Sequence, residues 1–316
     1  MVFVKIGDKM PSFEVIVKRS ILIAGVLFLL LGCNGIKVSK SMLKMIVSAS
    51  VKGENKALFY ADSCGKRIGI PYVQNGDPAQ VFDVYYADSS VRKDAVLIDI
   101  HGGFYVAGNR KNNRPFASVF LKEGYDVVLL EYRLNDGSRD VSDALSDCAA
   151  AMAFLTEHAG QLGINKDRFF LTGDSAGGHL ALYIAEREFT PKAVLLNCPA
   201  YDFASFANTE IYTEDALAWF IGPRWDDDQW RASVSPRTHI GRYSGPLLVS
   251  TCTNDFIRSE SLKLKADCDS LGRSIEFVDI QSKDKKVGHV HNVAAPVLPE
   301  SRTVNDRMIA FMNEHL

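Results

Sequence analysis

The sequence predicts an α/β fold with one mostly parallel central sheet and helices on both of its faces. From about residue 58, apolar strand-like runs alternate with helix-like segments, the order that builds β-α-β units. Several of these runs are continuously apolar, which is typical of strands buried on both faces. The 316 residues are 47% hydrophobic and 23% charged, the composition of a folded globular protein with a large core.

The expected elements follow one another without an internal repeat or a Pro/Ser-rich linker, so we expect one domain over 56–316. The expected strands span 80–87, 95–100, 126–132, 168–172, 193–197, 247–251 and 275–280. The expected helices span 116–123, 141–158, 176–187, 260–271 and 302–315. Segment 201–240 has no clear strand and contains all three tryptophans, Trp219, Trp225 and Trp230. We expect a helical insertion there, over the carboxyl edge of the sheet.

The N-terminus predicts export. Lys18 and Arg19 precede an uncharged apolar run over 21–31, which as a helix rises only about 16 Å, half of a bilayer. The run ends at Leu31-Gly32-Cys33, which resembles the lipobox of bacterial lipoproteins. That resemblance implies a signal peptide over 1–32, acylation of Cys33, a tether over 33–55 and a lipid anchor in the bacterial cell envelope, in the periplasm or at the cell surface. The alternative is an uncleaved signal anchor with a buried cysteine.

Charge and cysteine spacing exclude several partners. The 36 Lys and Arg against 38 Asp and Glu give a net charge of −2, so no basic excess suggests nucleic acid as a partner. None of the six cysteines forms a C-x-x-C pair, which argues against a zinc ribbon or a thioredoxin-type site.

A nucleophile elbow is predicted at Gly173-Asp174-Ser175-Ala176-Gly177, between an expected strand and an expected helix. Glycines suit the sharp turn, which raises Ser175 above the sheet beside the positive end of the helix. A second motif, His101-Gly102-Gly103-Phe104, follows the strand over 95–100. We expect the N–H groups of Gly102, Gly103 and Ala176 to stabilise an oxyanion, and His101 to fix the loop.

These motifs resemble the α/β-hydrolase superfamily, nearest the hormone-sensitive-lipase-like and feruloyl-esterase-like carboxylesterases. The resemblance spans about 95 to 300 and is carried by His101-Gly102-Gly103, Glu131-Tyr132-Arg133-Leu134, the elbow, Asp255 and the run from Gly288 to Val293. Two features depart from the pattern. The first loop has two glycines where many relatives have three, and His291 stands where relatives often have an aromatic residue.

The chain order of this fold is nucleophile, acid and histidine. Asp255 follows the strand over 247–251 and is the favoured acid, and Asp202 is the alternative. His289 and His291 share a loop after the last strand. The resemblance assigns the general base to His289 and leaves His291 to line the site. We expect no metal, because the two histidines have no third ligand at suitable spacing.

The expected reaction is hydrolysis of an ester without a cofactor, through acylation of Ser175. Alternatives are an amide hydrolase such as a formamidase or exopeptidase, a lipase, and a binding protein without catalysis. Segment 201–240 mixes aromatic residues with charged ones instead of presenting a broad apolar face. We therefore expect a small-molecule or oligosaccharide ester with a short acetyl or hydroxycinnamoyl group on a polar alcohol. The substrate-lining residues that we expect are Phe104, Tyr201, Trp219 and His291.

Overall fold

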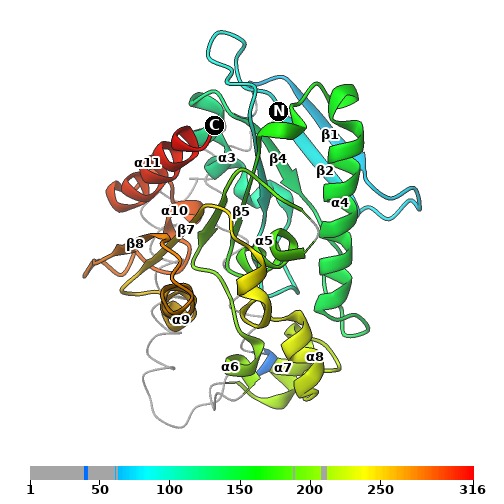
Figure 1. Cartoon of the computed structure of the whole chain (residues 1–316). Helices are drawn as coiled ribbons and strands as arrows, with labels where there is room; N and C mark the ends of the chain where they lie inside the picture. The colour runs from blue at the N-terminus through cyan, green and yellow to red at the C-terminus, as the bar shows by residue number, and fades with distance from the viewer. Residues whose placement is uncertain (1–38, 42–60, 62, 188, 208–211) are drawn as a thin grey trace, which may run out of the picture.

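The computed structural model describes residues 39–41, 61, 63–187, 189–207 and 212–316 (Figure 1). The predicted signal peptide, Cys33 and most of the predicted tether lie outside the described residues. Within the described ranges, no helix combines the length and the apolar character that crossing a membrane requires.

Eight strands form one sheet in the order β1-β2-β4-β3-β5-β6-β7-β8. Strand β2 pairs antiparallel with both β1 and β4, and every other neighbouring pair is parallel, so the prediction of a mostly parallel sheet is confirmed. The bounds are β1 Lys66–Pro71, β2 Val81–Tyr85, β3 Val96–Ile100, β4 Asp126–Leu130, β5 Phe169–Asp174, β6 Val194–Asn197, β7 Leu247–Cys252 and β8 Glu276–Ile280.

Strand β1 is the one strand of the described sheet that the sequence did not predict. Its six residues lie at the sheet edge and five of them are exposed, so the segment carries neither a continuous apolar run nor a clean alternation. The other seven strands coincide with the expected runs to within two or three residues.

Helices cover both faces of the sheet (Figure 1). Val96, Ile98 and Ile100 of β3 pack in the same core cluster as the apolar residues of α4, α5 and α9, whereas Leu97 packs in the opposite cluster with those of α3 and α11. This alternation follows from the period of two in a strand. The bounds are α3 Arg114–Lys122, α4 Val141–Leu162, α5 Ala176–Arg187, α9 Arg258–Ser270, α10 His291–Ala294 and α11 Pro299–Glu314.

The segment expected as an insertion is helical where the structure describes it. It contains α6 Phe203–Ala207, α7 Glu214–Phe220, α8 Asp228–Val234 and the 3-10 helix η4 Pro236–Arg242. Helices α6, α7 and α8 gather together at one end of the molecule (Figure 1). Trp219 and Trp230 are buried and Trp225 packs partly buried against the same core cluster, so the tryptophans attach these helices to the body.

Candidate active site

Ser175 lies between the last residue of β5 and the first residue of α5. Its φ of +53° is in the left-handed region, which residues other than glycine rarely adopt. The Ser175 N–H donates to Asn197 O at 2.9 Å, and Ser175 O accepts from Ala200 N at 3.1 Å. A Cβ on Gly177 would lie 1.9 Å from Ile100 O, so the elbow packs against β3 only because this residue is glycine.

Asp255 and His289 form an acid–base pair in which the aspartate is buried and the histidine is partly buried. Asp255 follows β7, His289 follows β8, and His289 Nδ1 lies 2.7 Å from Asp255 Oδ1. The carboxylate also accepts from Thr251 Oγ1 at 2.9 Å and from Ile257 N at 3.1 Å. Burial alone would raise the pKa of Asp255, but the charge and hydrogen bond of His289 and these two donors lower it. Asp255 is therefore ionised, and it orients the imidazole through Nδ1.

The pair lies beside the pocket that Ser175 lines. Ser175 and Phe256 both line the pocket, and the ring of Phe256 lies 4.3 Å from that of His289. Among the described residues no hydrogen bond joins Ser175 to His289. In free enzymes such bonds are often long and shorten when substrate binds.

The alternative acid and base have other partners. Asp202 forms ion pairs with Lys263 at 3.2 Å and Arg237 at 3.0 Å, which lower the pKa of Asp202 although burial opposes this. His291 Nδ1 lies 3.0 Å from Ser301 Oγ, and burial lowers the pKa of His291 to about 4. His291 therefore stays neutral in the contact between α10 and α11.

Two of the three expected oxyanion donors remain available. Within the described ranges, the N–H groups of Gly103 and Ala176 have no hydrogen-bond acceptor. The Gly102 N–H instead donates to Asp174 Oδ1 at 3.1 Å, which differs from our expectation. A Cβ on Gly102 would lie 3.1 Å from Ser175 Cβ, so the loop passes directly beside the serine.

Buried polar groups hold this loop in place. His101 Nε2 lies 3.1 Å from Glu131 Oε1, and the His101 ring stacks on Tyr132 with centroids 4.4 Å apart. Burial acts to lower the pKa of His101, but the Glu131 carboxylate outweighs it and raises that pKa. The loop-fixing role that the sequence suggested for His101 agrees with these contacts.

Behind the loop, Asn113 Nδ2 donates to both Asp99 Oδ2, at 2.9 Å, and Asp174 Oδ1, at 2.8 Å. Burial and the charge of Asp174 raise the pKa of Asp99 to about 8, so the Asp99 carboxyl is mostly protonated at neutral pH. Asp174 thus links the elbow to the loop through its contacts with Gly102 and Asn113.

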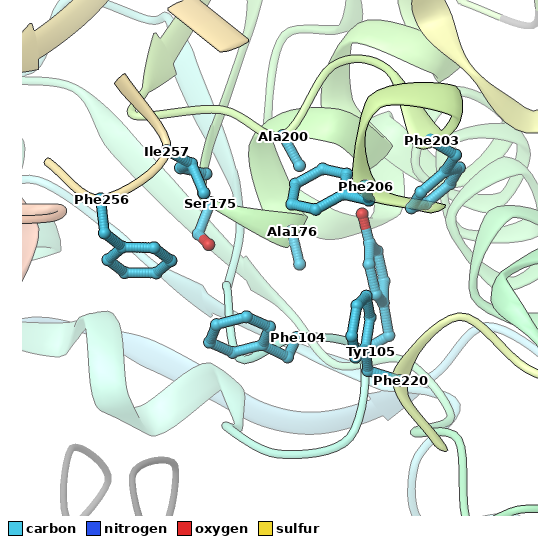
Figure 2. A pocket seen from close by; sticks show the side chains of 10 residues that line it. All are labelled: Phe104, Tyr105, Ser175, Ala176, Ala200, Phe203, Phe206, Phe220, Phe256 and Ile257. Atoms are coloured by element: carbon cyan, nitrogen blue, oxygen red, sulfur yellow. The ribbon is translucent and has the colours of Figure 1, made fainter. Parts of the chain in front are cut away.

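The pocket beside Ser175 has a mostly aromatic lining (Figure 2), and its empty space, including the part open to solvent, is about 300 Å³. Phe104, which the sequence predicted, is part of that lining. The complete lining is Phe104, Tyr105, Ser175, Ala176, Ala200, Phe203, Phe206, Phe220, Phe256 and Ile257.

The structure places the other three expected lining residues elsewhere. Tyr201 is fully buried and its hydroxyl donates to Asp267 Oδ2 at 3.0 Å. Trp219 and His291 are buried outside this lining. Tyr105, Phe220 and Phe256 line the pocket instead. Each of them directly follows a residue that the sequence analysis had assigned to the site, and this adjacency was the signal that could have identified them.

Cys198, Asp255 and His289 are the residues of the described chain that could together hold a metal, with ligand atoms within 4.8 Å of one another. Two of those atoms already bond to each other in the Asp255–His289 pair. Burial raises the pKa of the Cys198 thiol well above its usual range, and the thiol accepts the Val290 N–H at 3.3 Å. A metal here would replace the hydrogen bond that orients the imidazole.

The chain is similar to known proteins over a large part of its length. The model of the BD-FAE family matches residues 82–266, more than half of the chain. Lipase 2 of Moraxella sp. is 36% identical over 99 residues, 31% of this chain and 23% of that protein. Ethyl acetate hydrolase of Pseudomonas putida is 28% identical over 198 residues, 58% of this chain and 58% of that protein. The chain thus spans less than two thirds of either relative.

Solved structures show the same fold. Esterase B from Lactobacillus rhamnosis has a TM-score of 0.73 at 21% identity, over 92% of this chain and 95% of that chain. A truncated carbohydrate esterase from gut microbiota has a TM-score of 0.64 at 19% identity, over 79% of this chain and 96% of that chain. The predicted α/β-hydrolase fold is therefore confirmed, and with the family model matched from β2 into α9, the chain belongs to the BD-FAE family.

Proposed function

We propose that this protein is a serine carboxylesterase in which Ser175, His289 and Asp255 form a catalytic triad. The observation that carries the proposal is the 2.7 Å contact between His289 Nδ1 and a buried, ionised Asp255, beside a pocket that contains the elbow serine. The relatives and structural neighbours support ester hydrolysis as the reaction, since they include an ethyl acetate hydrolase, a lipase and esterases.

In this mechanism His289 Nε2 takes the proton of Ser175 while Asp255 stabilises the imidazolium. Ser175 Oγ attacks the ester carbonyl, and the N–H groups of Gly103 and Ala176 bind the developing oxyanion. His289 then returns the proton to the leaving alcohol, and water hydrolyses the acyl-enzyme by the same steps.

Variants of the three residues test this mechanism. Ser175→Ala should abolish ester hydrolysis while the protein stays folded. His289→Ala and Asp255→Asn should each lower kcat by about 10³-fold or more, because triad members act as a unit. Asp279→Asn is the matched control, since Asp279 is a partly buried carboxylate that pairs with Arg258 outside the pocket lining. A His291→Ala variant slower than His289→Ala, or an Asp202→Asn variant slower than Asp255→Asn, would contradict the assignment.

The proposed substrate is a short acyl ester, acetyl or hydroxycinnamoyl, of a carbohydrate or similar polar alcohol. The mostly aromatic lining of the pocket supports a small or flat acyl group. We expect kcat/KM to fall about tenfold or more as the acyl chain grows from two to eight carbons. Activity that rises with chain length would indicate a lipase, and faster hydrolysis of an aryl formamide would indicate an amide hydrolase.

The proposed location is the bacterial cell envelope, with a lipid anchor on Cys33. The short apolar run and the Gly32-Cys33 sequence that follows it support this proposal. Expressed in a bacterium from the full chain, the protein should partition with membranes and incorporate labelled palmitate. Cys33→Ser should lose the label and Cys64→Ser should keep it. Unlabelled wild-type protein in the soluble fraction would contradict the anchor.

A further inference from the structure

Tyr105 carries the one polar side-chain group in the pocket lining besides Ser175. The residue is 3% exposed, and its hydroxyl has no hydrogen-bond partner among the described residues. Figure 2 shows the hydroxyl pointing toward Phe203 and Phe206. A buried hydroxyl without a partner destabilises a folded protein, so its retention in a pocket points to a ligand that supplies the bond.

Neighbouring groups do not satisfy this hydroxyl. Glu260 acts on it only through its charge, because the Glu260 carboxylate already accepts from the N–H of Asp202 at 2.8 Å and from Lys263 at 3.1 Å. The His179 ring meets the Tyr105 ring edge-on, with centroids 5.6 Å apart. Burial and the Glu260 charge raise the pKa of Tyr105 well above its usual range, so the hydroxyl stays protonated and can donate.

The backbone holds Tyr105 in this position. Phe104 and Tyr105 have φ values of +55° and +63°, both in the left-handed region. Tyr105 O accepts from Asn135 N at 2.7 Å, which fixes the residue to the loop after β4. Strained backbone that persists in a pocket is typical of a functional position.

The position of His289 decides which part of an ester reaches Tyr105. His289 must protonate the leaving alcohol, and its ring lies beside Phe256. In Figure 2, Phe256 lies on one side of Ser175, and Tyr105, Phe203 and Phe206 lie on the other. The alcohol therefore leaves on the Phe256 side, and the acyl group extends toward Tyr105.

We propose that the Tyr105 hydroxyl binds an oxygen at the far end of the acyl group, so that the enzyme selects acyl groups with an aromatic or apolar body and an oxygen at the tip. This inference rests on the proposed function, because it assigns the acyl side of the Ser175 site. The aromatic lining provides contact area for the body, and the hydroxyl provides the single polar contact.

The test compares matched esters of one alcohol that differ only in the terminal oxygen. The pairs are benzoate with 4-hydroxybenzoate, and 3-phenylpropanoate with 3-(4-hydroxyphenyl)propanoate, so that two lengths are sampled. Wild-type protein should hydrolyse the oxygenated member of at least one pair with about tenfold higher kcat/KM. In Tyr105→Phe that ratio should fall to about one, whereas in the control Tyr212→Phe, a buried tyrosine outside the lining, it should stay at the wild-type value.

The melting temperature separates recognition from a structural role. Removing a hydroxyl that has no protein partner should leave the Tm of Tyr105→Phe equal to or above the wild-type value. A lower Tm, a wild-type ratio near one in both pairs, or an undiminished ratio in Tyr105→Phe would overturn the inference. Wild-type protein that hydrolyses no ester at all, acetyl esters included, would instead contradict the proposed function.

Discussion

Three residues around the pocket have backbone conformations that side chains ordinarily avoid. Ser175, Phe104 and Tyr105 have φ values between +53° and +63°, and each lines the same pocket. Such strain costs of the order of 1 kcal/mol or more per residue and persists only where surrounding contacts impose it. Here Asn197, Ala200 and Asn135 supply backbone hydrogen bonds to these segments.

Gly102→Ala should lower kcat by about 100-fold or more, because a misplaced oxyanion donor loses most of its effect. The added Cβ would lie 2.5 Å from Asp174 Oδ2, so the loop must move away from the serine. Gly241→Ala is the control, since a Cβ there meets nothing within 4 Å. Steady-state kinetics on an acetyl ester measures both variants. A Gly102→Ala enzyme with wild-type kcat would show that this loop does not position the oxyanion.

The sequence predicted the site residues that belong to short motifs, and missed those that depend on contacts between distant segments. Ser175, Gly103 and Ala176 follow from local turn chemistry. The bond from Gly102 to Asp174 joins residues 72 apart in the chain, and nothing in either motif indicates it. The same limit applies to the pocket. Phe203 and Phe206 lie in the segment expected above the sheet, but only the packing of α6 shows that they face Ser175.

Among the elements, α4 shows how caps decide where a helix stops. It was predicted to end near residue 158 and ends at Leu162. Asp140 begins the helix as an N-cap that accepts from Ser142 N at 2.8 Å, and Gly163 ends it with a φ of +68°. Left-handed glycine is the usual helix terminator, so Gly163 and not Gly160 marks the end.

Gly160→Ala should stabilise the protein by about 1 kcal/mol, since alanine is the better helix former. Residue 160 lies inside α4 and a Cβ there meets nothing within 4 Å. The Tm should rise by about 2–4 °C in a scanning calorimeter. Gly163→Ala, the matched change at the left-handed cap, should lower the Tm. If Gly160→Ala also lowers it, the last turn of α4 is not helical as described.

Helix α5 contains a buried acid that makes stability depend on pH. Both carboxylate oxygens of Glu186 lack a partner among the described residues. Burial raises the pKa of Glu186 from 4.5 to about 9, although Arg187, Arg242 and Arg273 act against it. Between these values the folded protein holds a proton that the unfolded chain has released. The free energy of unfolding therefore falls as the pH rises through this window.

Glu186→Gln should remove this loss, because glutamine resembles the protonated acid. The Tm of the variant should match that of the wild-type protein near pH 4.5 and exceed it increasingly up to pH 9. A difference of the order of 1–3 kcal/mol at pH 8 is expected for a buried acid kept neutral. Thermal unfolding at several pH values measures it. A Tm difference that does not grow with pH would show that the carboxylate is ionised or solvated in the folded state.

For the whole molecule, the alternation of strands and helices was sufficient to predict the sheet, its mostly parallel pairing and the edge that carries the site. The six strands from β3 to β8 make parallel pairs and have mostly apolar sequences, which is why they could be located. The antiparallel strand β2 was located as well. The exposed edge strand β1 has no such signal. Ser175, Asp255 and His289 each follow a different strand, so the sequence predicted three distant loops at one edge of the sheet. In the structure, Asp255 and His289 are in contact.

Covalent labelling of the purified protein with a fluorophosphonate, followed by peptide mapping, tests most directly whether Ser175 is the nucleophile. We expect one adduct, on Ser175, formed rapidly in the wild-type protein and about 10³-fold more slowly in His289→Ala, because the imidazole must take the serine proton. An adduct on another residue, or equal labelling rates in the two proteins, would contradict the claim that Ser175 is a nucleophile activated by His289.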